Sequence, residues 1–376
     1  MPYQVTEKHP APGPESQAPC SRFLPLTPGG LALVLVSLLS GCASPTRAPE
    51  GFEPPVYPPP PDEPRFVYER TLRVAEDVQK LTGFEKLRLA ATGKSPVARG
   101  LVKPYGVAVR QGRVYVTDTA QRAVLLFDMA AGRYRQFGEQ EPGALIKPTG
   151  IAVSPTGEVF VADTSARRIR VYDPDGAYLR TLGNDELLTR PSGVALSPDG
   201  RTVYVVDVGG VDTNHHRVQV FDAQTGQHQQ TIGTRGREGG QFNLPLQAAT
   251  APDGTLYVVD GGNFRVQAFT AAGGYVFSFG RLGRFPGQFA RPKGIATDRN
   301  GNIYVVDAAF GNVQLFNPKG QVLMFIGRRA RASSPGQFSL PAGVAVDEGG
   351  RVYVVDQFFR KIDIFRPVGP DTATPP

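Results

Sequence analysis

Short runs in which apolar and polar residues alternate recur along the chain from residue 101 onward. In each unit a Pro opens an apolar run, a Gly-containing turn follows, and a second apolar run ends in Asp. A third run ends in an aromatic residue, and a fourth run completes each of the first five units. Because β-branched and aromatic runs between Gly turns favour short antiparallel strands, each unit is predicted to contain four strands.

The unit occurs six times, at intervals of 43 to 54 residues. The first runs are PYGVAV from Pro104, PTGIAV from Pro148, PSGVAL from Pro191, PLQAAT from Pro245, PKGIAT from Pro292 and PAGVAV from Pro341. The second runs end at Asp118, Asp163, Asp207, Asp260, Asp307 and Asp356. Four strands in a unit of this length are typical of a propeller blade. The pattern therefore predicts an all-β fold, a six-bladed β-propeller.

A strand outside the repeats is expected to close the ring. The sixth unit ends after its third run, at Phe365, and lacks a fourth run. The run RFVYERTL, residues 65–72, alternates in the same way and precedes the first unit. If it supplies the outer strand of the sixth blade, the first and last segments of the domain pair and the seam has no open sheet edge. The predicted propeller spans residues 65–367.

The repeat resembles the NHL repeat of six-bladed propellers. The match is best in blade four, where Gly262–Phe269 reads GNFRVQAF. The motif GQF also recurs in the connections between blades, at Gly240–Phe242, Gly287–Phe289 and Gly336–Phe338. The resemblance implies the fold and says little about function, since such propellers serve as binding platforms, scaffolds, lyases and lactonases.

The first forty-two residues resemble the export signal of a bacterial lipoprotein. The apolar run Leu31–Leu39 is too short to cross a bilayer as a helix but suits the core of a signal peptide, and Arg22 precedes it. The following LSGC, ending at Cys42, resembles a lipobox. This resemblance implies a signal peptide over residues 1–41 and a lipid on Cys42. Because Ala43 is not the Asp that favours inner-membrane retention, it also implies an exported protein anchored to the outer membrane.

Three further segments flank or precede the repeats. Residues 42–64 begin with Cys42 and then carry nine prolines in twenty-two positions, which predicts a semi-rigid polyproline tether. Residues 75–92 are expected to form a short helix packed on the propeller, with a partner-binding helix as the alternative. Residues 368–376 are a Pro-rich tail.

The long connections between blades should share one face with the turns between second and third strands, because successive antiparallel strands alternate in direction. This long-loop face is where a binding site is expected. A basic arc is predicted over blades five, six and one, because the connections into blades five and six and the segment 81–104 leading into blade one each have a charge of +3 or more. Over blades five and six its arginines are Arg281, Arg284, Arg291, Arg328, Arg329 and Arg331. The chain has a formal net charge of +7. In an exported protein this arc is expected to bind an envelope protein or an anionic glycan or lipid head group rather than nucleic acid. The alternative is that the arginines only solubilise the loops.

A five-residue insertion in blade three places His215 and His216 side by side on the same face. His216 aligns with Phe264 of blade four, an ordinary position of the repeat. The insertion is therefore predicted to be a contact loop specific to this blade. Metal binding by His215 together with Asp212 is the alternative.

Two enzyme classes share this fold and compete with a binding role. A zinc lyase needs three or four converging donors, and the innermost runs contain no His, Cys, Asp or Glu. The strand-end aspartates could suggest a calcium-dependent lactonase. One Asp at the same place in every blade instead predicts a structural role, in which the carboxylate accepts hydrogen bonds from a neighbouring turn. No cofactor is expected, with calcium as the alternative. The prediction is a non-catalytic binding or scaffolding lipoprotein, and the alternative is a metal-dependent lactonase or lyase-like enzyme.

Overall fold

A computed structural model of the chain describes residues 52–79, 99–210 and 213–369, with Gly83, Leu87, Ala91 and Thr92. The chain divides into a unit of residues 1–52 and a unit of residues 53–376, and the second unit holds all the repeats. The predicted signal peptide and Cys42 lie outside the described residues.

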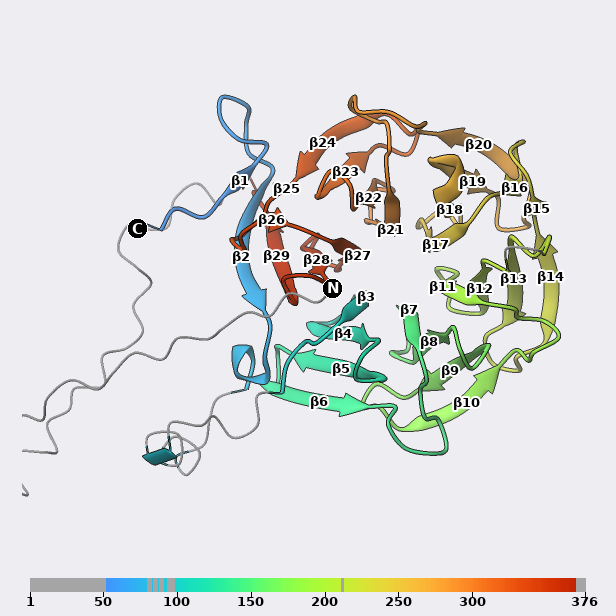
Figure 1. Ribbon diagram of the computed structural model, residues 1–376, viewed down its shortest axis with the longest axis horizontal. Coiled ribbons are helices and arrows are strands. Elements are labelled where there is room, and N and C mark those ends of the chain that lie inside the picture. The colour runs from blue at the N-terminus through green and yellow to red at the C-terminus, as the bar shows by residue number, and fades with distance from the viewer. Residues whose placement is uncertain are drawn as a thin grey trace, which may run out of the picture. The chain divides into compact units, whose positions relative to one another are not determined.

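The second unit is a ring of six blades around a central channel (Figure 1), which confirms the predicted all-β six-bladed propeller. The innermost strands are β3 (Pro104–Arg110), β7 (Pro148–Val153), β11 (Pro191–Leu196), β17 (Pro245–Thr250), β21 (Pro292–Thr297) and β27 (Pro341–Val346). The second strands are β4 (Arg113–Asp118), β8 (Val159–Asp163), β12 (Thr202–Asp207), β18 (Leu256–Asp260), β22 (Ile303–Asp307) and β28 (Val352–Asp356). The third strands are β5 (Ala123–Asp128), β9 (Arg168–Tyr172), β13 (Arg217–Asp222), β19 (Arg265–Phe269), β23 (Asn312–Phe316) and β29 (Lys361–Pro367). The outer strands of blades one to five are β6 (Arg133–Phe137), β10 (Tyr178–Leu182), β14 (His228–Ile232), β20 (Tyr275–Phe279) and β24 (Val322–Ile326).

The ring closes as the alternating run before the repeats predicted. β2 (Phe66–Leu72) pairs antiparallel with β29 and completes blade six, so the N-terminal strand and the last repeat share one sheet. At this seam the Thr71 hydroxyl donates to the carboxylate of Asp363 at 2.7 Å, and the buried Lys361 ammonium donates to the same carboxylate at 2.6 Å. The closing strand is therefore held by a buried polar cluster as well as by strand pairing.

The Pro-rich segment differs from the predicted free tether in its second half. β1 (Val56–Tyr57) pairs with β2 and adds a fifth strand to blade six. The Tyr57 ring meets Phe365 edge to face with 5.5 Å between centroids, and burial raises the pKa of Tyr57 to about 12. The two residues between prolines thus supply strand pairing and apolar area that a polyproline spacer lacks.

Six hydrophobic clusters form the core, one between each two neighbouring blades of the described domain. Side chains from facing strands of two blades interdigitate in each cluster, as alternation with a period of two requires. In the connections, Phe242, Phe289 and Phe338 of the GQF motifs are fully buried wedges, and Leu145 and Leu188 take this place in the other two described connections between blades. The recurrent Phe therefore anchors a connection and is not a surface contact.

A glycine in each innermost strand except that of blade four marks where adjacent blades approach closely. A Cβ placed on Gly150 would lie 2.7 Å from the Cα of Gly193 in the next blade. Blade four has Gln247 instead, whose side-chain oxygen accepts the Val194 N–H at 3.1 Å. The Pro-x-Gly pattern is thus a packing requirement of the ring.

Two smaller features complete the described fold. Pairs of two-residue strands, β15 (Thr234–Arg235) with β16 (Gln241–Phe242) and β25 (Arg328–Arg329) with β26 (Gln337–Phe338), shape two connections. The segment predicted as a helix begins with the 3-10 turn η1 (Ala75–Asp77), a second such turn is η2 (Gly261–Asn263), and most of residues 80–98 lie outside the described residues. No helix within the described ranges is long and apolar enough to cross a membrane.

Candidate binding face

The strand-end aspartates tie each connection between blades to the turn beside it. In blade five, Oδ2 of Asp307 accepts from the N–H groups of Ala290 at 2.7 Å and Arg291 at 3.0 Å. Its Oδ1 accepts from Ala309 at 2.8 Å and Phe310 at 3.1 Å. Blades one, two and six repeat this pattern with Asp118, Asp163 and Asp356. These fully buried carboxylates place the connections and the turns together on one face, the long-loop face.

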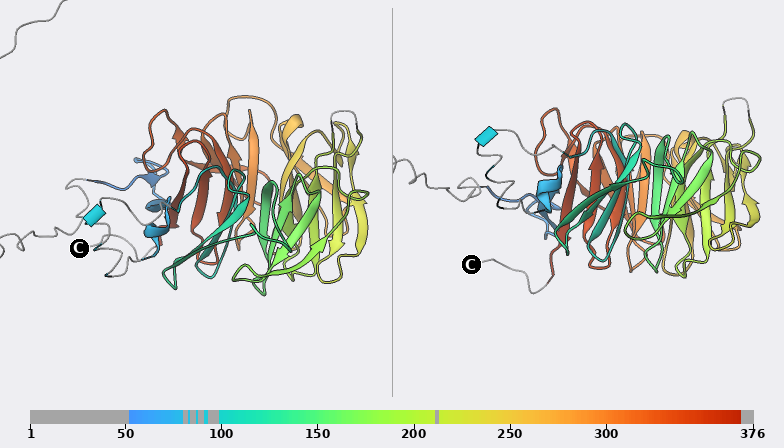
Figure 2. Two further views of the ribbon diagram at one scale, coloured as in Figure 1. Left: turned by 60° about the horizontal axis from the view of Figure 1, so that its bottom comes forward. Right: turned by 90° about the horizontal axis from the view of Figure 1, so that it is seen from below.

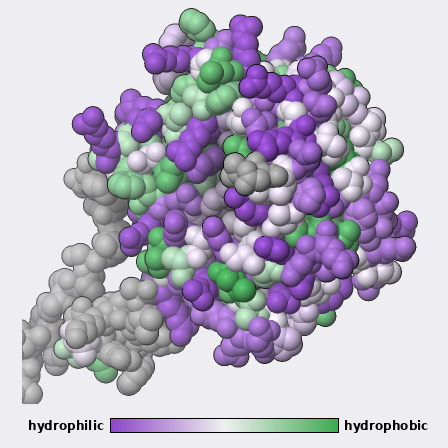
Figure 3. All heavy atoms as spheres, turned by 45° about the vertical axis from the view of Figure 1, so that its right-hand side comes forward, coloured by the Kyte–Doolittle hydropathy of each residue, from purple (hydrophilic) through white to green (hydrophobic). Residues whose placement is uncertain are grey.

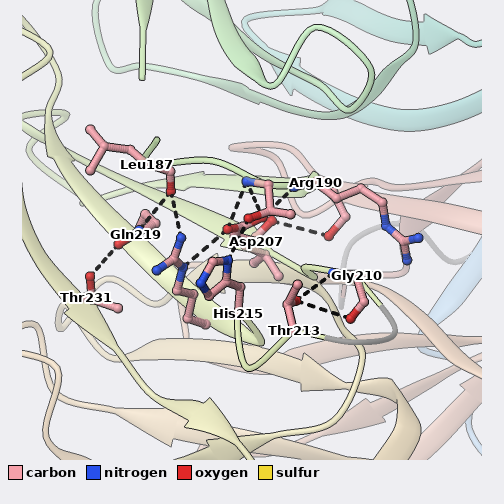
Figure 4. A network of polar contacts seen from close by, with 12 residues as sticks. Leu187, Arg190, Asp207, Gly210, Thr213, His215, Gln219 and Thr231 are labelled. Atoms are coloured by element: carbon pink, nitrogen blue, oxygen red, sulfur yellow. Dashed lines mark hydrogen bonds and ion pairs between the residues drawn. The ribbon is translucent and has the colours of Figure 1, made fainter. Parts of the chain in front are cut away.

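In blades three and four the strand-end Asp still accepts from the backbone of the connection, but its other donors are side chains. Asp207 accepts from the N–H groups of Thr189 and Arg190 and from Nε of Arg217 at 3.3 Å (Figure 4). Asp260 accepts from the Asn243 N–H at 2.6 Å and from the side chains of Asn263, Arg265 and Gln267. The repeated role is kept although the donors change.

These carboxylates do not fit the calcium site of a lactonase. A carboxylate that accepts four hydrogen bonds has used the acceptor capacity that a cation would need. Among the residues that the structure describes, no group of three or more His, Cys, Asp and Glu could hold a metal ion. The strand-end carboxylates of this face therefore act as acceptors for backbone N–H groups.

The two histidines at the blade-three insertion form hydrogen bonds to two neighbouring connections between blades. Nδ1 of His215 lies 2.8 Å from the Thr189 hydroxyl, beside the Asp207 network (Figure 4). His216 is 2% exposed, its Nδ1 accepts the Leu244 N–H at 3.2 Å, and burial lowers its pKa. Because His216 is buried against the next connection, its side chain is not presented on the binding face. Asp212, the proposed metal partner of His215, lies outside the described residues.

The predicted basic arc is solvent-exposed. All six arginines of the arc, Arg281, Arg284, Arg291, Arg328, Arg329 and Arg331, have exposed side chains. Arg329 donates from Nη1 to the Ala309 carbonyl at 2.9 Å. The other five make no side-chain hydrogen bond or ion pair with the described part of the chain. Their charge is therefore available to a partner.

A second set of cations surrounds the channel mouth, and only Arg291 of this set was assigned to a binding site from the sequence. Lys103, Lys147, Arg190 and Arg291 each stand directly before the first Pro of an innermost strand, and all four are exposed. In each case the backbone N–H donates to the strand-end Asp, which fixes the position of the residue. None forms an ion pair within the described ranges. We call these four residues the cationic ring.

The signal for the cationic ring was present as a Lys or Arg before the repeated Pro in four of six units. Summing charge over whole connections hid it, because acidic residues elsewhere in connections 138–148 and 183–191 cancel the basic ones. Two residues after Arg291, Lys293 is half-buried, and burial followed by the Arg291 charge lowers its pKa to about 8. Lys293 thus adds a fifth basic side chain beside the cationic ring.

Side views separate the two rims of the ring, which both consist of loops (Figure 2). Most of the surface visible in Figure 3 is hydrophilic, with hydrophobic side chains in separate patches. The rim opposite the long-loop face consists of short turns such as SPTGE and SPDGR. It offers no connection long enough to form a specific contact loop.

The fold and this face define a six-bladed β-propeller with one loop-rich, cationic end. The NHL repeat family matches residues 145–172 and 188–221, and a β-propeller repeat matches residues 282–306. The chain is an NHL-repeat six-bladed β-propeller.

Relatives and solved structures agree on the fold. The human E3 ubiquitin-protein ligase NHLRC1 is 30% identical over 165 residues, 43% of this chain and 37% of that protein. The protein brain tumor of Drosophila melanogaster is 32% identical over 126 residues, 32% of this chain and 11% of that protein. The match thus spans well under half the length of either relative.

Among solved structures, a streptogramin B lyase has a TM-score of 0.54 at 15% identity, covering 72% of this chain and 96% of that one. A gluconolactonase from Xanthomonas campestris has a TM-score of 0.54 at 18% identity, covering 71% and 87%. These likenesses concern the fold.

Proposed function

We propose that the protein is a non-catalytic binding or scaffolding lipoprotein of the bacterial cell envelope that engages an anionic partner through its long-loop face. The observation that carries the proposal is the cationic ring: four exposed cations that encircle the channel mouth without an ion pair among the described residues. Unpaired charges of one sign, held by a rigid scaffold, attract and orient a partner of opposite sign. The partner is an envelope protein or an anionic glycan or lipid head group.

A binding role is favoured over catalysis by the state of the carboxylates. General acid-base or metal chemistry needs carboxyl or imidazole groups near a cavity whose oxygen or nitrogen atoms are free to exchange a proton or to bind a metal. The oxygens of the buried strand-end aspartates already accept hydrogen bonds from N–H groups. Nδ1 of His216 accepts a hydrogen bond from the N–H of Leu244 in the next connection. What this face presents to a ligand is cationic and amphipathic.

The anionic-partner proposal is tested with fluorescein-labelled poly-L-glutamate as the probe. We compare the full chain with a variant that carries Lys103→Gln, Lys147→Gln, Arg190→Gln and Arg291→Gln. The backbone N–H groups that hold the aspartates remain, so the fold is expected to stay intact. The affinity measured by anisotropy should fall by about tenfold or more, and its dependence on salt should weaken.

The matched control lies on the opposite rim. Arg299 and Lys319 are exposed and carry no ion pair in the described chain, so Arg299→Gln with Lys319→Gln should leave the affinity unchanged. Because the control removes two charges and the ring variant four, a loss of binding free energy in the control of about half that in the ring variant would mean that the probe reads only net charge. An unchanged affinity of the ring variant would refute the proposed site.

Envelope anchoring is tested separately. The full chain is expressed with Cys42→Ser, which removes the acceptor of the predicted lipid. The protein should move from the membrane fraction to the soluble fraction on cell fractionation. Retention of the variant in the membrane fraction, together with an unmodified Cys42 in the wild-type protein by mass spectrometry, would contradict the lipoprotein assignment.

A further inference from the structure

Exposed large apolar side chains gather on the long-loop face. Six of those in the described chain lie in its connections and turns: Val102, Ile146, Leu244, Leu282, Phe285 and Phe358. Three of them, over blades five and six, are the most exposed: Phe285 at 75%, with Leu282 and Phe358 at 64%. The turns of the opposite rim, all within the described ranges, carry none. Leu282 and Phe285 lie three positions apart in one loop, and neighbouring protruding apolar side chains on a folded domain are typical of a contact surface.

The fold does not require Leu282 and Phe285. The connections 233–245 and 280–292 form the same turn, in which a Gln side chain accepts the N–H group of the residue three positions before it. At the matching positions the first connection has Arg235 and Glu238, both compatible with the same parallel bridge and the same turn. Leu282 and Phe285 are therefore not needed to form the turn, and their apolar side chains affect only the surface of the connection.

The charges around these apolar tips are predominantly positive. The segments 280–292, 308–311, 327–341 and 357–360 of this face contain no Asp or Glu. The acidic residues beside them are Glu76 and Asp77 of η1, a segment that Arg73 joins to Phe359 and Ser333. The four segments contain seven arginines, the six of the basic arc and Arg360, all exposed. Leu282 and Phe285 alternate with Arg281 and Arg284 in one loop. Aromatic and leucine side chains that protrude among exposed arginines are the arrangement found at the interface of an anionic bilayer.

We propose that the long-loop face over blades five and six is a docking surface for an anionic lipid bilayer, in which Leu282, Phe285 and Phe358 enter the head-group region and the surrounding arginines meet lipid phosphates. This rests on the proposed function and names its partner as a membrane surface. A soluble acidic protein would be matched by the charge but not by protruding apolar tips. In this geometry the channel axis stands across the membrane plane, and the opposite rim faces away from the lipid.

The test uses the full chain with Cys42→Ser, so that no acyl anchor contributes to binding. Binding to sedimenting vesicles of phosphatidylcholine with about a quarter phosphatidylglycerol should exceed binding to pure phosphatidylcholine by about tenfold, and should weaken at high salt. Leu282→Arg with Phe285→Glu installs the residues of the matching connection. This double variant should lose about tenfold or more of the vesicle affinity, because the apolar contribution is removed. Leu323→Arg with Tyr275→Glu, at exposed apolar sites of the outer strands, should not lose affinity.

Insertion has its own readout, since the chain contains no Trp. With Phe285→Trp, the single indole should shift its emission to the blue on adding the anionic vesicles and should be quenched by brominated acyl chains. With Leu323→Trp, the emission should not change. An indole at position 285 that stays solvent-exposed with bound vesicles would overturn the insertion.

The two proposals fail in different ways. If the wild-type protein binds poly-L-glutamate through the cationic ring but not the anionic vesicles, the membrane inference is overturned and the anionic-partner proposal stands. If the double variant binds vesicles as well as the wild type does, the inference is also overturned, because charge alone then accounts for the binding.

Discussion

The role of the strand-end aspartates can be measured through Asp307→Asn. The change keeps the size of the side chain and replaces one acceptor oxygen with an NH2 group. If the NH2 group takes the place of Oδ1, the N–H groups of Ala309 and Phe310 lose their acceptor. If it takes the place of Oδ2, the Ala290 N–H loses its acceptor and the Arg291 N–H keeps only its 3.2 Å bond to Oδ1. Asp307 is fully buried, so water does not replace the lost bonds.

A buried donor left without a partner costs about 1–3 kcal/mol, and the less costly amide orientation leaves one such donor, so Asp307→Asn should lower the free energy of unfolding by about 1–3 kcal/mol. The assay is urea unfolding followed by circular dichroism. Asp185→Asn is the control, because Asp185 is exposed and forms only the surface ion pair with Arg168 at 3.1 Å. Its loss should be below about 0.5 kcal/mol.

The same experiment discriminates a metal site from a structural carboxylate. If Asp307 bound calcium, added calcium would raise the unfolding midpoint of the wild type and not of Asp307→Asn. We expect calcium to change neither protein. A loss below about 0.5 kcal/mol for Asp307→Asn would refute the structural role of this carboxylate.

Three further changes test the fold. Gly150→Ala should lower stability by about 2 kcal/mol or more in urea unfolding, because its Cβ would meet the next blade at Gly193. Lys293→Met should stabilise the protein by up to about 3 kcal/mol below pH 8, where folding holds a half-buried ammonium; the gain should vanish as pH rises towards 10.5, where the unfolded lysine also loses its proton. Tyr57→Ala should raise hydrogen exchange at Arg65 and Tyr68, whose N–H groups donate to the carbonyls of Tyr57 and Pro55, by detaching β1; unchanged exchange would contradict the packing of that segment.

The ring of blades could be predicted because its determinants are local and repeated. Each Gly turn, each alternating run and each terminal Asp recurs in register, so an error in one unit is corrected by the other five. The pairing that closes the ring was predictable for the same reason, since the sixth unit lacks a fourth strand and residues 65–72 supply an extra strand before the first unit. Strand pairing at β2 then follows from the alternation of its residues.

What could not be predicted depends on contacts between distant segments. Pro-rich composition indicates an extended chain, but whether Val56 and Tyr57 pair with β2 depends on the ring of Phe365, some 300 residues later. The burial of His216 depends on the connection into blade four. The lowered pKa of Lys293 depends on how closely the blades enclose it. The cationic ring, in contrast, was readable from the residue before each Pro.

The most direct test of the binding face is a lysine-labelling footprint of the protein in native envelope membranes. Lys103 and Lys147 belong to the cationic ring, and Lys319 lies on the opposite rim, so one reagent reports on both ends of the channel. Labelling of the first two should be at least about fivefold slower in membranes than in the detergent-extracted protein, since a bound partner excludes reagent from what it covers. Lys319 should be labelled equally in both. Protection of Lys319 with free labelling of Lys103 and Lys147 would contradict the account.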